Sequence, residues 1–156
     1  MGLFRLDDVL QMAMRAEQMG QTLYEATAKE AKDPKVSDLC RRLAAQEKSH
    51  YETFKAMSEA LPPDFDAKRL SLDEMAFVQS LVEGTVIPTE AEVRKAARDA
   101  GLAQMLDRAI QAERDSQAFY QQIAQGVDAK DTSAIKVIIA EEAQHEKTLT
   151  QMRKSL

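Results

Sequence analysis

The sequence predicts an all-α fold, a four-helix bundle in which a long crossover joins two antiparallel helical hairpins. Strong helix formers dominate the composition, and the chain has only 5 Gly and 4 Pro. Apolar residues recur at alternating three- and four-residue steps over four long segments, which is the spacing of a buried bundle face. The two halves of the chain also repeat one pattern of polar residues, as described below.

The first hairpin is predicted from residues 6–32 and 36–61. Asp33-Pro34 separates its two helices, because proline disfavours helical geometry in the residue before it. Pro62-Pro63 ends the second helix. The connection is short, so we expect the two helices to pack antiparallel.

The second hairpin is predicted from residues 102–125 and from a helix that begins after Asp131-Thr132 and reaches about Met152. Gly126 stops the first of these helices. The short connection again predicts an antiparallel pair.

The segment that links the hairpins is long and carries helix signals of its own. Residues 71–82 are predicted to form a short helix. A second helix should begin at the capping box Thr89-Glu90-Ala91-Glu92 and end or kink at Gly101. So long a link can carry the chain from one end of the bundle to the other, which is the ferritin-like topology.

Length and composition restrict the class of protein. The 156 residues predict a single domain over residues 1–156. The net charge of -5, with no basic stripe, argues against nucleic acid as a partner. Cys40 is the single cysteine, so neither a disulfide within the chain nor a CxxC metal appendage is possible. We expect a cytoplasmic protein, because no signal peptide and no apolar run of about 18 residues is found.

Acidic residues occupy the middle of each predicted buried stripe, and the stripes carry no Lys or Arg. The first helix of each hairpin has a Glu followed seven residues later by a Tyr, and the second has Glu-x-x-His. The only two histidines of the chain lie in these motifs. The repeated residues are Glu17 and Tyr24, Glu47 and His50, Glu113 and Tyr120, and Glu142 and His145.

Four buried carboxylates without countercharge would be very costly, and two divalent cations would neutralise them. Glu and His three residues apart on a helix share one face, so both can reach one ion. One Glu from each of two helices, with Glu-x-x-His from each of the other two, is the ligand set of di-iron carboxylate bundles. We predict that Glu47 and Glu142 bridge two ions, with Glu17 and His50 completing one shell and Glu113 and His145 the other. Iron is preferred, with manganese or zinc as possible substitutes.

Other side chains near this pattern have two interpretations. Tyr24 and Tyr120 lie two turns after a predicted ligand, so their hydroxyls can support a carboxylate across the site. Alternatively, they are large core side chains with a polar tip. Cys40 is expected to be a small buried residue rather than a redox group.

With these motifs the sequence resembles the rubrerythrin branch of the ferritin-like superfamily. The resemblance covers all four main helices, through residues 12–24, 47–50, 109–120 and 142–145. It implies a ferritin-like fold, a non-haem di-iron centre, a homodimer, and peroxide or dioxygen as the small-molecule substrate. Two features depart from rubrerythrins. The chain lacks a rubredoxin domain, so electrons must come from a separate protein such as a rubredoxin, and Ser116 stands where rubrerythrins tend to have an extra glutamate.

We therefore predict a di-iron redox protein that reduces peroxide or dioxygen. The six-ligand set also resembles that of bacterioferritins, so an iron-binding or storage protein with ferroxidase activity is the first alternative. A structural bundle with a vestigial metal site is the second. No membrane partner is expected.

Overall fold

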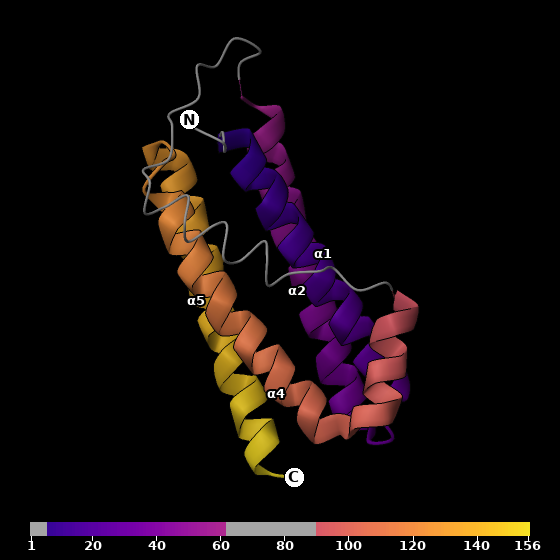
Figure 1. The fold of residues 1–156 in the computed structure, drawn as a ribbon. Helices are drawn as coiled ribbons and strands as arrows, with labels where there is room; N and C mark the ends of the chain where they lie inside the picture. Colours follow the sequence, from indigo (N-terminus) through magenta and orange to yellow (C-terminus); the bar gives the residue numbers. More distant parts are fainter. Residues whose placement is uncertain (1–5, 62–89) are drawn as a thin grey trace.

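The computed structural model of the chain describes residues 6–61 and 90–156. Within these ranges the chain is helical and has no strand, which confirms the predicted all-α class. The helices form two antiparallel hairpins that lie side by side (Figure 1). They are α1 (Leu6–Glu30), α2 (Pro34–Glu59), α4 (Glu90–Ala124) and α5 (Ala129–Lys154).

The connection between α1 and α2 is fixed by side chains that bond to the backbone. Asp33 caps α2, and its carboxylate accepts a hydrogen bond from the Lys35 N–H at 2.9 Å. Pro34 occupies the first helical position, where a missing N–H costs nothing. The Ser37 hydroxyl donates to the Ala28 carbonyl at the end of α1, at 2.7 Å. These contacts hold the two helices in a tight hairpin.

The connection between α4 and α5 repeats this arrangement. Asp128 caps α5 and accepts from the Asp131 N–H at 2.8 Å, and the Thr132 hydroxyl donates to the Ala124 carbonyl at 3.0 Å. The prediction that this helix begins after Asp131-Thr132 was wrong, because α5 begins at Ala129. Two aspartates three residues apart can each act as the cap, and the earlier one does so.

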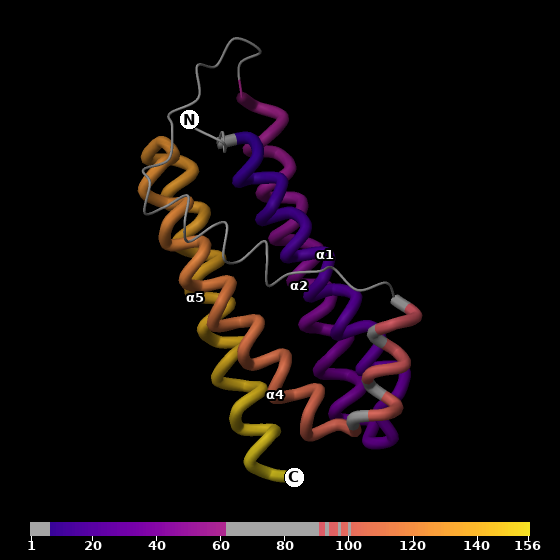
Figure 2. The backbone as a smooth tube through the Cα atoms, viewed as in Figure 1, coloured from indigo at the N-terminus to yellow at the C-terminus, as the bar shows by residue number. Residues whose placement is uncertain are grey.

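A kink divides α4 at Gly101, as predicted. Gly101 has φ 77° and ψ 167°, a conformation that a residue without Cβ adopts readily. The helix starts at Glu90, beside the predicted cap Thr89, which lies outside the described residues. Figure 2 shows the turn between the two parts of α4. The helix predicted over residues 71–82 also lies outside the described residues.

The link between the hairpins joins opposite ends of the bundle. In Figure 1, α2 ends at the upper end, and the part of α4 after its kink starts at the lower end. This confirms the predicted crossover. Among the described helices, none is long and apolar enough to cross a membrane.

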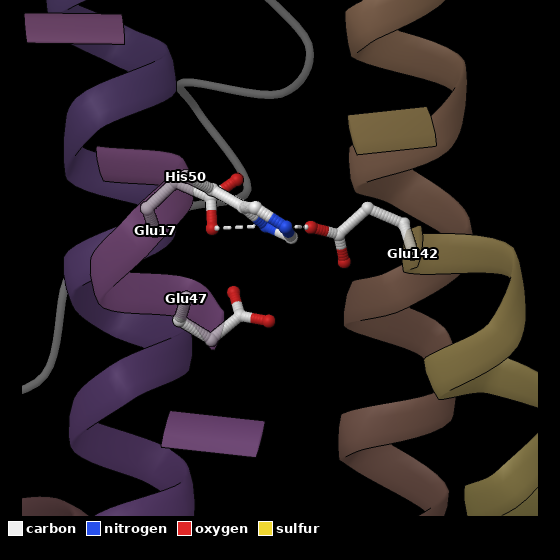
Figure 3. Close-up of side chains that lie close together, drawn as sticks. All are labelled: Glu17, Glu47, His50 and Glu142. Carbon is white, nitrogen blue, oxygen red and sulfur yellow. Dashed lines mark ion pairs between the residues drawn. The ribbon is translucent and has the colours of Figure 1, made fainter. Parts of the chain in front are cut away.

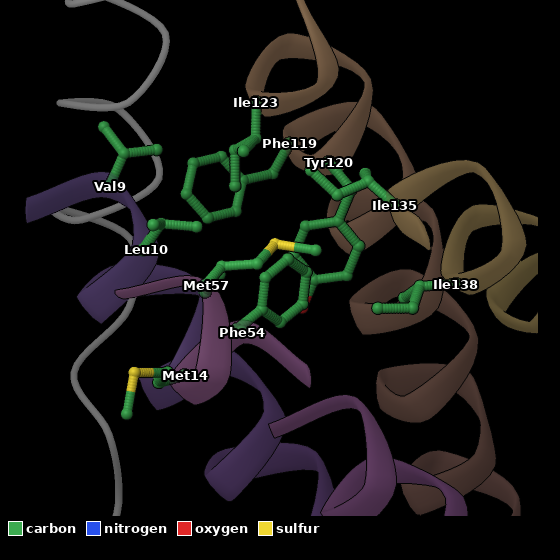
Figure 4. Close-up of a cluster of buried hydrophobic side chains, with 11 residues drawn as sticks. Val9, Leu10, Met14, Phe54, Met57, Phe119, Tyr120, Ile123, Ile135 and Ile138 are labelled. Carbon is green, nitrogen blue, oxygen red and sulfur yellow. The ribbon is translucent and has the colours of Figure 1, made fainter. Parts of the chain in front are cut away.

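Among the described residues, two large apolar clusters fill the bundle, one toward each end, and a small third cluster contains Ala26 and Met105. The first takes side chains from all four helices (Figure 4). The second cluster also takes side chains from all four helices, and it lies further along the bundle. Each helix passes from one cluster to the other, so its middle lies between them. The first cluster includes Leu10, Phe54, Met57, Phe119, Tyr120, Ile123, Ile135 and Ile138, and the second includes Tyr24, Val36, Leu43, Leu106, Ile110 and Leu149.

Candidate metal centre

Six polar side chains lie in the middle of the bundle, between the two apolar clusters. Their exposed fractions range from 1% to 4%. The structure brings together every residue that the sequence singled out as a metal ligand. They are Glu17 on α1, Glu47 and His50 on α2, Glu113 on α4, and Glu142 and His145 on α5.

The six residues form two overlapping groups of potential ligands. Within each group the ligand atoms all lie within 4.8 Å of one another. Glu47 and Glu142 belong to both groups, and each of the other members belongs to one group. Each group takes three residues from one hairpin and one from the other. The first group is Glu17, Glu47, His50 and Glu142 (Figure 3), and the second is Glu47, Glu113, Glu142 and His145.

The histidine Nδ1 atoms face the carboxylates. His50 Nδ1 lies 2.7 Å from Glu142 Oε1 and 3.4 Å from Glu17 Oε2. His145 Nδ1 lies 3.1 Å from Glu47 Oε1. The two imidazole rings are stacked, with centroids 5.9 Å apart.

These close contacts do not satisfy the polar atoms. Both Nδ1 atoms and five carboxylate oxygens are fully buried without a hydrogen-bond partner, although buried polar atoms nearly always have one. Carboxylate and imidazole groups that converge in this way suit iron or manganese. The cluster therefore fits a pair of metal ions. The five oxygens are Glu17 Oε2, Glu47 Oε1, Glu113 Oε2 and both oxygens of Glu142.

The Nε2 atom of each histidine, which faces away from the cluster, contacts a side chain of the opposite hairpin. His50 Nε2 lies 2.6 Å from Glu141 Oε2, and His145 Nε2 lies 2.8 Å from Gln46 Oε1. Such contacts orient the ring and leave Nδ1 toward the cluster. Sequence reasoning missed both partners. Each immediately precedes the glutamate of a Glu-x-x-His motif, but its own helix does not indicate which histidine it contacts.

Two tyrosines connect α1 with α4 across the cluster. The Tyr24 hydroxyl donates to Glu113, and the Tyr120 hydroxyl donates to Glu17. Both side chains are at most 2% exposed. Burial, reinforced by the nearby carboxylates, raises the pKa of both hydroxyls, so they remain protonated donors.

Burial and mutual repulsion make the cluster hold protons. Burial, with help from the Glu142 carboxylate, raises the pKa of Glu113 to about 8, and burial likewise raises the pKa of Glu47. Burial opposes charge on the histidines, but contact with carboxylates outweighs it and raises the pKa of His50 to about 11 and that of His145 to about 12. The pKa of Glu142 is lowered, because its neighbours outweigh its burial. A metal ion that enters must displace these protons.

Gly20 makes room for one shared carboxylate. A Cβ placed on Gly20 would lie 2.6 Å from Glu47 Oε2 and 3.1 Å from Glu47 Cδ. A real Cβ does not approach that closely, so any side chain here would move the Glu47 carboxylate. Gly20 lies one helical turn after Glu17, on the same helix.

Cys40 has the predicted place in the core. It is a free cysteine with an exposed fraction of 1%, in the cluster that contains Leu43 and Leu106. Burial raises the pKa of its thiol to about 11, which keeps the thiol unreactive at neutral pH.

Comparisons with known proteins agree with this geometry. The family model described as Rubrerythrin matches residues 8–153. The fold is similar to the crystal structure of a candidate ferritin-like diiron-carboxylate protein from Thermotoga maritima, with a TM-score of 0.79 and 26% sequence identity. The alignment covers 97% of this chain and 95% of that one. No curated protein matches the chain at a significant level.

Proposed function

The chain belongs to the rubrerythrin family, and from this membership we propose that it binds two iron ions and uses them to reduce peroxide or dioxygen. The observation that carries the proposal is the cluster of buried carboxylate and imidazole atoms that converge without hydrogen-bond partners. A purely structural bundle would gain nothing from such atoms, since unsatisfied buried polar groups cost stability.

The six side chains would hold the two ions in matching sets of three carboxylates and one imidazole, and the two sets would share two members. Glu47 and Glu142 would bridge, because they are common to both groups of ligand atoms. When bound, a pair of ferrous ions supplies two electrons, one each, which with two protons convert hydrogen peroxide into two molecules of water.

The remaining roles belong to the chain itself. Tyr24 and Tyr120 hold the carboxylates of Glu113 and Glu17 in position through their hydroxyl hydrogen bonds. The apolar clusters on either side keep bulk water away from the buried ligands. We propose that a separate donor protein, such as a rubredoxin, returns the electrons after each cycle.

Metal content and redox response test the proposal. Protein from iron-replete culture should contain two irons per chain. Its near-ultraviolet absorption bands should vanish on anaerobic reduction and return when one equivalent of peroxide is added. Glu47→Gln should lose both properties, whereas Lys48→Gln, at the exposed neighbouring position, should keep them. Zinc or no metal, with no spectral response, would contradict the proposed redox role.

The same protein discriminates the ferroxidase alternative. Continued peroxide consumption with an external reductant, at a fixed two irons per chain, supports the reductase. Uptake of many irons per chain, without sustained turnover, supports iron storage instead.

A further inference from the structure

The two halves of the cluster differ in charge at one pair of matched positions that contact the histidines. Glu141 and Gln46 each precede a Glu-x-x-His motif, and each reaches across to the histidine of the opposite hairpin. His50 therefore contacts a carboxylate at 2.6 Å, whereas His145 contacts an amide oxygen at 2.8 Å.

The rest of the two groups is closely matched. Each group contains three carboxylates and one imidazole, and two of the carboxylates are common to both. Each unshared carboxylate, Glu17 or Glu113, accepts a hydrogen bond from a buried tyrosine. At the histidine Nε2 contacts, the two groups therefore differ in charge, with a carboxylate from Glu141 on one side and a neutral amide from Gln46 on the other.

A carboxylate and an amide affect a ligating imidazole differently. A carboxylate that accepts the Nε2–H makes the imidazole a stronger donor at Nδ1 and adds negative charge close to the ion. An amide oxygen orients the ring but adds no net charge. The Glu141 side chain is 45% exposed, so solvent weakens its effect without removing it.

We propose that the two metal positions are unequal, that the position of Glu17 and His50 binds a divalent ion first and more tightly, and that Glu141 is the positioning residue that sets this order. The inference rests on the proposed metal pair. Changes in such outer partners typically alter metal affinity by about 10- to 100-fold. With partial solvent exposure, we expect the two binding steps to differ by about 10-fold.

The order of binding can be read directly, because the chain has only two histidines. Zn²⁺ is titrated into protein with ¹⁵N-labelled histidine, and the ring-nitrogen signals are followed by NMR. A His145→Asn variant assigns the signals. In the wild type, His50 signals should shift during the first equivalent and His145 signals during the second. Calorimetry of the same titration gives the separation of the two steps.

Reciprocal substitutions provide the matched test. Glu141→Gln should weaken the first step by about 10-fold, and Gln46→Glu should strengthen the second step by a similar factor. The double exchange, Glu141→Gln with Gln46→Glu, should reverse the order in which the histidines respond. Gln144→Glu, on the exposed face of α5, is the control for added charge and should leave the order unchanged. Circular dichroism checks that each variant is folded.

The contrary outcomes separate this inference from the proposed function. If two Zn²⁺ bind and the signals of both histidines shift together, the proposed difference between the two positions is overturned. The same holds if the order of binding is unchanged in the double exchange. Neither result would contradict the proposed metal centre. A folded wild type that binds no pair of Zn²⁺ would overturn both the inequality and the proposed metal centre.

Discussion

The Tyr24 hydroxyl on α1 donates a hydrogen bond to the Glu113 carboxylate on α4, and it does so from the opposite hairpin. Tyr120 on α4 makes the equivalent contact with Glu17 on α1. Each hairpin thus supports a ligand candidate of the other. This reciprocal arrangement follows from the repeated spacing of seven residues between Glu and Tyr.

Removing one hydroxyl should weaken one metal position more than the other. Tyr24→Phe should lower divalent-metal affinity at Glu113 and His145 by about 10-fold, because the carboxylate loses the donor that orients it. Tyr120→Phe should have the same effect at Glu17. Calorimetric titration with Mn²⁺ measures both changes. Tyr51→Phe is the control, because Tyr51 is half-buried against the first apolar cluster and is not among the described residues that hydrogen-bond to the ligand candidates. Unchanged affinity in all three would make Tyr24 and Tyr120 ordinary core side chains.

Gly20→Ala should weaken metal binding without lowering the free energy of unfolding. The new methyl group would displace the Glu47 carboxylate, which is the mobile end of a side chain, so metal affinity should fall by about 10-fold or more. The free energy of unfolding without metal should stay the same or rise by up to about 1 kcal/mol, because Ala favours helix over Gly. Gly126→Ala is the control, since its Cβ would meet only the Ile123 carbonyl at 3.6 Å. Full metal affinity in Gly20→Ala would mean that the position of Glu47 is not critical.

Shared and unshared carboxylates should give different stoichiometries. Glu142→Gln should prevent tight binding of either ion, because Glu142 belongs to both groups. Glu17→Gln should weaken only one position and leave about one tightly bound ion per chain. Equilibrium dialysis with Mn²⁺ measures the number of ions bound. Equal loss in both variants would refute the assignment of Glu142 as a bridge.

Without metal, stability should fall as pH rises, and bound metal should reduce this fall. Because the pKa of Glu113 is raised from 4.5 to about 8 and that of His50 from 6.5 to about 11, the folded cluster binds more protons than the unfolded chain at intermediate pH. In EDTA, Tm should therefore fall from about pH 6 to about pH 8. Saturating Mn²⁺ should offset this fall, because fewer protons then compete with the metal. Differential scanning calorimetry measures the gap between the two Tm values, which should widen with pH. A constant gap would show that the cluster protons do not compete with metal.

The repeat made most of the bundle predictable from the sequence. A seven-residue spacing places Glu17 and Tyr24 on one helix face whatever the packing, and Glu-x-x-His does the same for Glu47 and His50. The kink at Gly101 was also predictable, because glycine tolerates positive φ. These features depend on local geometry alone.

Features that depend on how helices cross were not predictable from one chain. Glu141 and Gln46 lie beside the buried stripe, and nothing in their own helix indicates which histidine each will reach. The closeness of Gly20 to Glu47 depends in the same way on the separation of α1 and α2. At the start of α5, Asp128 and Asp131 offered equivalent caps, and only the geometry of the turn chose between them.

Each group of ligand candidates contains a residue from the opposite hairpin, so a bound pair of ions would act as a cross-link between the two halves of the chain. Breathing motions that separate the hairpins would have to release a shared carboxylate and expose like-charged glutamates to one another. The supply of metal in the cell would thereby set how long the folded chain survives proteases. In such a protein, starvation for metal would shorten molecular lifetime as well as remove the proposed activity.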